Sequence, residues 1–194
     1  MTRRGAPQQL RIIGGAWRSR RLPFAATAGV RPTPDRIRET LFNWLQGQIA
    51  GARCLDLFAG SGALGFEALS RGARELVSVD QDIRVIQQLQ ANAELLGCTS
   101  ILQLAWQDAL EYLTTASGRF DIVFIDPPYR DEIIGECCQR LETRRLLAPG
   151  ALIYVESSTQ HPAPPLPEGW TLLRDKQAGQ VHYQLARTAA AESL

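Results

Sequence analysis

The segment Asp126-Pro127-Pro128-Tyr129 directly follows the apolar run 121–125, which predicts a buried strand. Proline lacks an N–H and holds the preceding residue extended, so a carbonyl at this point is left outside a sheet ladder. Asp126 and that carbonyl can accept both protons of an exocyclic –NH2 group, while Tyr129 can stack on the ring that carries it. The segment therefore predicts a site that orients a planar amine for attack. The alternative is a simple strand-ending turn, which Asp-Pro often begins.

A glycine-rich loop is the second chemical feature. Gly60, Gly62 and Gly65 match the spacing of nucleotide-binding loops, and they lie between a predicted strand, 54–58, and a predicted turn and helix, 60–71. Asp80 comes twenty positions after Gly60, at the end of the next predicted strand, where an acid can hold a ribose. The order of strand, glycines, helix, strand and acid predicts a bound adenosine cofactor, more strongly than it predicts a structural turn.

The position of Asp56 indicates which cofactor that is. A dinucleotide places its pyrophosphate on the glycine loop, where the carboxylate of Asp56 would repel it. S-adenosylmethionine instead brings an ammonium group and a sulfonium, which a carboxylate favours. Glycine spacing alone leaves an NAD-dependent oxidoreductase open. Asp108, after the third strand, can accept from the adenine amino group, cap a helix, or do both. The expected cofactor contacts are Asp56, Phe58, Gly60, Ser61, Gly62, Asp80, Gln81, Asp108 and Ala109.

Charge is distributed unevenly along the chain. Residues 1–38 carry nine arginines and a single acid, Asp35, although the net charge of the whole chain is +1. A basic arm on an acidic body predicts contact with a polyanion such as nucleic acid; the alternative is a solvated, arginine-rich terminus. The candidate RNA contacts are Arg11, Arg18, Arg20, Arg21, Arg36 and Arg38. Whether the helix that begins near Thr33 faces the cofactor, RNA or solvent stays open.

The predicted elements form an α/β fold. Two short strands about Gly14-Gly15, 10–13 and 16–22, predict a hairpin, and Thr33 with Pro34 predicts the start of a helix. Strands 54–58, 75–80, 101–104, 121–125 and 151–156 then alternate with helices, the last of which, 131–147, is expected to end at Pro149-Gly150. Runs 170–174 and 181–187 predict a terminal hairpin. We expect a mainly parallel seven-stranded sheet, Rossmann-like, with helices on both faces and a terminal antiparallel hairpin.

The expected organisation is a basic N-terminal extension over 1–46, a cofactor-binding domain over 47–188 and a frayed tail over 189–194. The chain has no apolar run long enough to cross a membrane and no apolar core near Met1 typical of a secretory signal. A cytoplasmic protein is therefore expected. No metal site is predicted, and four cysteines are expected to be free thiols that pack in the core: Cys54, Cys98, Cys137 and Cys138.

Together the glycine loop, Asp80 and the tetrapeptide at 126–129 resemble class I S-adenosylmethionine-dependent methyltransferases that modify exocyclic amines. Three further stretches resemble the bacterial RsmD family: Arg11-Ile12-Ile13-Gly14-Gly15-x-Trp17, the stretch from Arg31 to Leu45, and Ala151-Leu152-Ile153-Tyr154-Val155-Glu156-Ser157. The resemblance runs from about Leu10 to Arg187.

This resemblance implies methylation of the N2 of a guanine in 16S rRNA, the guanine numbered 966, by a monomer acting on the small ribosomal subunit or its precursor. It also implies a catalytic role for Asp126, Pro127, Pro128 and Tyr129, although the family often has phenylalanine in place of Tyr129. DNA amine methyltransferases (adenine-N6 or cytosine-N4) share the tetrapeptide and remain an alternative. A non-enzymatic RNA-binding module is a further alternative, but it would not need Asp126 and Tyr129 beside a cofactor loop.

Overall fold

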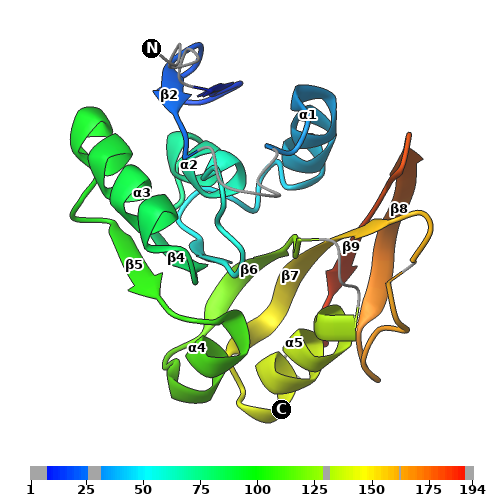
Figure 1. The fold of residues 1–194 in the computed structure, drawn as a ribbon. Coiled ribbons are helices and arrows are strands. Elements are labelled where there is room, and N and C mark those ends of the chain that lie inside the picture. Colours follow the sequence, from blue (N-terminus) through cyan, green and yellow to red (C-terminus); the bar gives the residue numbers. More distant parts are fainter. Residues whose placement is uncertain (1–7, 26–31, 129–131, 162, 191–194) are drawn as a thin grey trace.

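The structure is a computed structural model that describes residues 8–25, 32–128, 132–161 and 163–190. One sheet of seven strands, in the order β5-β4-β3-β6-β7-β9-β8, forms its centre (Figure 1). The strands are β3 (Arg53–Asp56), β4 (Glu75–Asp80), β5 (Leu102–Trp106), β6 (Phe120–Ile125), β7 (Leu147–Ser158), β8 (Thr171–Ala178) and β9 (Val181–Arg187). The pairs from β5 to β7 are parallel, while β9 is antiparallel to both β7 and β8. The expected sheet and its terminal antiparallel hairpin are confirmed.

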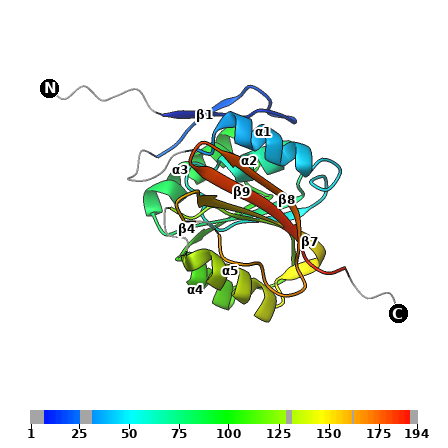
Figure 2. The same ribbon diagram turned by 90° about the vertical axis from the view of Figure 1, so that its right-hand side faces the viewer.

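Helices cover both faces of the sheet (Figures 1 and 2). They are α1 (Asp35–Trp44), α2 (Ala63–Ser70), α3 (Ile83–Leu96), α4 (Ala109–Thr115) and α5 (Glu132–Thr143). Two apolar clusters result, one under α1, α2 and α3 and the other under α4 and α5. Side chains along each strand alternate between these clusters, as the two-residue period of a strand requires. All four cysteines are buried and free within these clusters.

The segment between α5 and β7 differs from the prediction. Helix α5 ends at Thr143 rather than continuing to residue 147, because Arg145 adopts a left-handed conformation (φ 54°) and Leu146 N–H bonds the Leu141 carbonyl at 3.0 Å. Strand β7 then begins at Leu147 and passes through Pro149-Gly150, which does not stop a helix here. The register shifts between Phe120 and Ile122 of β6, so the proline lies where the ladder is already interrupted.

The N-terminal hairpin is shorter than predicted, and its glycines serve a different purpose. Strands β1 (Gln9–Arg11) and β2 (Arg21–Pro23) pair with Leu10 opposite Leu22, and both of these side chains are buried. The intervening glycines make no tight two-residue turn. Gly15 (φ 76°) instead passes so close to α2 that an added Cβ would stand 1.9 Å from the Ser70 carbonyl oxygen. Only glycine allows this approach, and Ala16 N–H bonds that carbonyl at 2.7 Å.

Glu67 of α2 anchors the same loop. Its fully buried carboxylate accepts the N–H groups of Ile13 and Gly14, both at 2.8 Å, and the Nε–H of Arg71 at 2.7 Å. Leaving this buried carboxylate without such donors would cost about 3–5 kcal/mol. The bonds therefore stabilise one docked position of the hairpin. The arginine-bearing segment is thereby attached to the helix that follows the glycine loop.

The start of α1 also differs from the prediction. Thr33 does not cap the helix; Pro34 occupies the N-cap position and α1 begins at Asp35. The Thr33 hydroxyl instead donates to Asp126 Oδ2 at 3.2 Å, far along the chain. Of the expected frayed tail, residues 191–194 lie outside the described residues, while Ala189 accepts a bond from Gly150 N–H at 2.9 Å. None of the described helices is both long and apolar enough to cross a membrane.

Candidate active site

Four carboxyl groups lie side by side at or near the carboxyl ends of four neighbouring strands. Asp80 and Asp56 are the last residues of β4 and β3, and Asp126 follows the last residue of β6. Ile125 pairs with Val155, so Glu156 of β7 continues the same register beside Asp126. By strand alternation all four side chains point to the face covered by α1, α2 and α3. The chain reverses its strand order between β3 and β6, which is where parallel sheets of this kind bind ligands.

The glycine loop is fixed between β3 and α2 by Asp80. Asp80 accepts Gly60 N–H on Oδ2 at 2.9 Å and Asp82 N–H on Oδ1 at 2.8 Å. Gly62 occupies the N-cap of α2 with φ 77°, a left-handed conformation that a larger residue would adopt only with strain. Each carboxylate oxygen of Asp80 can accept a second bond, so the side chain both shapes the loop and keeps acceptors for a ribose.

The electrostatics of this edge favour a cationic ligand. Burial, together with the nearby charges of Asp126 and Asp80, raises the pKa of Asp56 to about 7. Burial also raises the pKa values of Asp80, Asp126 and Glu156, the last further through the charge of Asp126. Like charges in a row are destabilising unless a cation lies among them. The ammonium and sulfonium of S-adenosylmethionine supply such a cation, so the residues present fit that cofactor.

This arrangement predicts how cofactor affinity varies with pH. A cation beside Asp56 favours its carboxylate form, so binding must remove a proton at any pH below about 7. One proton corresponds to about a tenfold loss of affinity per pH unit. We expect the affinity for S-adenosylmethionine to fall about tenfold between pH 6.5 and 5.5, as isothermal titration calorimetry can measure. The variant Asp56→Asn should bind more weakly above pH 7 and show a pH slope smaller by one proton, so that the two affinities converge as the pH falls; an unchanged slope would contradict this assignment.

The remaining expected cofactor contacts surround the same end of the sheet. Asp108 caps α4 by accepting the N–H groups of Leu110 and Glu111 on Oδ1, at 2.8 and 3.2 Å. The helix-cap interpretation is therefore correct, and the contact with an adenine amino group, for which Oδ2 could serve, stays a prediction. The others differ in exposure: Ser61 and Ala109 are buried, Phe58 is partly buried and Gln81 is exposed, with its carbonyl bonded by Trp106 Nε1 at 3.0 Å.

Around Asp126 the structure adds two residues that sequence reasoning did not assign. Thr33 holds the Asp126 carboxylate from the α1 side, and the Thr33 carbonyl is itself held by Arg38 Nε at 3.1 Å. Glu156 lies on the other side, where its Oε2 accepts the hydroxyl of the fully buried Tyr154 at 2.9 Å. The sequence signal for Glu156 was an acid near the end of a predicted strand, the same signal that identified Asp56 and Asp80.

The rest of the tetrapeptide is only partly described. Pro127 is partly buried and Pro128 is exposed, both immediately beyond the end of β6. Tyr129 lies outside the described residues, so its predicted stacking role stays a prediction. The ring of Phe124 packs against Phe42 and Tyr154, with centroid distances of 6.1 and 6.4 Å. These apolar rings support the strands that carry Asp126 and Glu156.

The candidate RNA-binding arginines divide into two groups. Arg11, Arg18, Arg20 and Arg21 of the hairpin and Arg36 of α1 are exposed. Arg38 is not: only 1% of its surface is exposed, and it bonds Asp35 at 2.5 Å and lies 3.6 Å from Glu67. The expectation that Arg38 contacts RNA is wrong, because its guanidinium is enclosed between acidic groups that hold the hairpin and α1 on the domain.

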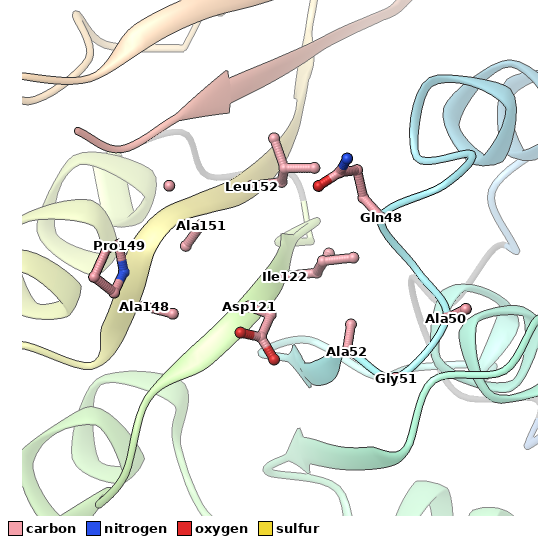
Figure 3. A pocket seen from close by; sticks show the side chains of 11 residues that line it. Gln48, Ala50, Gly51, Ala52, Asp121, Ile122, Ala148, Pro149, Ala151 and Leu152 are labelled. Carbon is pink, nitrogen blue, oxygen red and sulfur yellow. The ribbon is translucent and has the colours of Figure 1, made fainter. Parts of the chain in front are cut away.

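A pocket of about 270 Å³ lies at the other end of the strands from the carboxyl groups (Figure 3). It is lined by the loop 48–52, the start of β6 and residues 148–152, at the amino ends of the parallel strands. Its one acid, Asp121, already accepts Arg53 N–H at 2.8 Å and lies 3.6 Å from Arg74. Neither its chemistry nor its position connects it with the row of carboxyl groups, and we assign it no role.

Comparison with known proteins agrees with the resemblance found in the sequence. Residues 10–187 match the family model described as conserved hypothetical protein 95. The ribosomal RNA small subunit methyltransferase D of Escherichia coli (strain K12) is 47% identical over 95% of this chain and 93% of its own. The protein of that name from Haemophilus influenzae is 44% identical over 93% of this chain and 94% of its own. The chain belongs to the RsmD family.

Solved structures confirm the fold of this RsmD family member. That of the Escherichia coli protein yhhF has a TM-score of 0.88 and 45% identity, covering 94% of this chain and 99% of that one. An RNA methyltransferase from Salinibacter ruber, solved with S-adenosyl-L-homocysteine, shares the fold at a TM-score of 0.63 and 14% identity, over 84% of this chain and 96% of that one. With the relatives named above, the chain is a methyltransferase, which removes the oxidoreductase and the non-enzymatic alternatives.

Proposed function

We propose that this enzyme transfers a methyl group from S-adenosylmethionine to the N2 atom of a guanine in 16S rRNA, the guanine that the sequence resemblance indicates. The relatives named as small-subunit ribosomal RNA methyltransferases support the RNA substrate. The observation that carries the choice of an exocyclic amine is the position of Asp126 and Pro127 beside Asp56 and the glycine loop. We further propose that the enzyme acts as a monomer in the cytoplasm, on the small subunit or its precursor.

When bound, S-adenosylmethionine supplies a methyl group made electrophilic by a positive sulfur. The chain's own residues then have to present a poor nucleophile, because the lone pair of the guanine amine is delocalised into the ring. Asp126 and the Pro127 carbonyl accept the two N–H groups and turn the lone pair toward the methyl group. Orientation of this kind can supply about 7–11 kcal/mol of a barrier. The substituted amine loses its proton readily, so Asp126 has to hold the amine rather than act as a strong base.

Recognition of the RNA backbone is assigned to the exposed arginines of the hairpin and α1. Arg18, Arg21 and Arg36 are exposed and pair with no acid among the residues that the structure describes, whereas Arg11 pairs with Asp35 at 3.0 Å at the surface. Surface pairs of this kind contribute about 0–1 kcal/mol and are easily exchanged for a phosphate. The guanine must leave its stack or start in a loop, and Tyr129 would then stack on it, which is worth about 1–3 kcal/mol per base.

The experiment that tests the proposal is nucleoside mass spectrometry of ribosomal RNA from a strain lacking this gene. We expect the loss of one N2-methylguanine from 16S rRNA and its return when the gene is restored. Purified enzyme with labelled S-adenosylmethionine should then methylate rRNA or small subunits from the deletion strain but not those from the parent, where the site is already modified. Transfer to adenine or cytosine of DNA instead would replace the proposal with the DNA alternative.

A further inference from the structure

We infer that Glu156 is a specificity-determining residue that recognises guanine by accepting its N1–H. The inference rests on the proposed function and adds to it the group that distinguishes guanine from other amine-bearing bases. Glu156 stands beside Asp126 in the continued register of β6 and β7, on the same face of the sheet. A base whose exocyclic amine is held by Asp126 would therefore present the neighbouring atom of the same edge to Glu156.

The side chain is held as a base-reading group should be. Tyr154, with none of its surface exposed, donates its hydroxyl to Oε2 at 2.9 Å. This bond fixes the orientation of the carboxyl group and leaves Oε1 to accept from a base. Glu156 itself is partly exposed, so it is reachable from the site. Neither the methyl donor's cationic end, matched by Asp56, nor the amine, held by Asp126, requires this second acid. Burial, and then the charge of Asp126, raises the pKa of Glu156 to about 8, whereas donors such as the Tyr154 hydroxyl and a guanine N1–H favour its carboxylate form.

The chemistry of the bases explains what such an acid would select. In guanine the ring atom next to the N2 amine on the pairing edge is N1–H, a donor. In adenine and cytosine the corresponding atom, N1 or N3, is an acceptor. A carboxyl oxygen at this place therefore accepts from guanine and faces a lone pair in the other two. A buried acceptor left unpaired costs about 1–3 kcal/mol, so one such group can separate the substrates by about tenfold to a hundredfold.

The test compares guanine with 2-aminopurine, placed at the target position of a small-subunit rRNA fragment or of subunits assembled with it. Both bases carry the same N2 amine, but 2-aminopurine has an acceptor at N1 in place of N1–H. The variant Tyr154→Phe with Glu156→Leu removes the acid and its buried donor together, so neither is left unpaired. Tyr154→Phe alone is the matched control that keeps the acid, and Glu156→Gln keeps a carbonyl acceptor in the same place.

The measured quantity is the ratio of kcat/KM for guanine to kcat/KM for 2-aminopurine. We expect the double variant to lower this ratio at least tenfold, while Tyr154→Phe and Glu156→Gln keep it within about threefold of the wild-type ratio. A general structural defect would slow both substrates equally and leave the ratio unchanged. Melting temperature and binding of S-adenosylhomocysteine identify any variant that fails to fold, in which case the ratio for Glu156→Ala replaces it.

Two failures are distinguishable. If the wild-type enzyme methylates guanine N2 and the variant without the acid keeps the full preference for guanine, the role of Glu156 is wrong and the proposed function stands. If the wild-type enzyme methylates no guanine in rRNA, the proposed function is wrong and the role of Glu156 with it.

Discussion

Replacing Asp126 with alanine is expected to lower the rate of methyl transfer by about a hundredfold to ten-thousandfold while cofactor affinity stays nearly unchanged. The physical reason is that the carboxylate orients an amine that is a weak nucleophile in every other geometry. Its place just past the end of β6, next to Glu156 and held by Thr33 at 3.2 Å, supports its proposed role in holding the substrate rather than the cofactor. Asp56 and Asp80 would still hold the cofactor.

Single-turnover rates with saturating S-adenosylmethionine measure the chemical step, and calorimetry with S-adenosylhomocysteine measures binding. Asp126→Asn serves as the conservative comparison, because its amide oxygen can still accept one N–H of the base. We expect it to retain more activity than alanine, by about tenfold. A near-normal single-turnover rate in Asp126→Ala would remove the residue from the mechanism. A parallel loss of cofactor binding would instead place it in the cofactor half of the site.

The parts of the site that could be predicted are those encoded locally. A carboxylate at the end of a predicted strand identifies Asp56, Asp80 and Asp126 without any knowledge of their neighbours; glycines follow the first of them and prolines the last. That these three meet follows from the rule that parallel strands present their carboxyl ends at one edge. The mainly parallel sheet follows from the alternation of strands and helices, and the terminal hairpin from the two β-like runs at 170–174 and 181–187; both are confirmed.

What could not be predicted depends on tertiary contacts. The sequence places Glu156 at the end of a predicted strand, but only the register of β6 and β7 shows that it lies beside Asp126. Thr33 before a proline has the residue type of a helix cap, yet its hydroxyl bonds an aspartate ninety-three positions away. Gly14-Gly15 has the composition of a hairpin turn, but its glycines are required by the approach to Ser70 of α2.

The arginines of α1 show the same limit most clearly. Arg36 and Arg38 are two positions apart, carry the same charge and were expected to share a role. A helix turns about 100° per residue, so two positions apart means nearly opposite faces. Arg36 is consequently exposed, while Arg38 is enclosed by Asp35, Glu67 and the Thr33 carbonyl. Charge composition alone predicts a basic surface and cannot tell which arginines belong to it.

This pair provides a matched experiment on stability and RNA binding. We expect Arg38→Met to lower the free energy of unfolding by about 2–4 kcal/mol, because it leaves buried Glu67 with one cation fewer and frees the Thr33 carbonyl. Arg36→Met, on the same helix, should change it by less than about 0.5 kcal/mol. Urea denaturation followed by fluorescence or circular dichroism measures both, and methionine keeps most of the apolar side-chain contact in each case.

The two variants should rank in the opposite order in their effect on RNA affinity. Binding of a small-subunit rRNA fragment, measured over a range of salt concentrations, should weaken for Arg36→Met, and the slope of log affinity against log salt should fall by about one. Arg38→Met, studied at a temperature where it remains folded, should keep the wild-type salt slope because its guanidinium neutralises no phosphate. It should still methylate more slowly, since the same guanidinium holds Thr33 against Asp126. Equal stabilities for the two variants, or a reduced salt slope in Arg38→Met, would show that Arg38 faces the RNA after all.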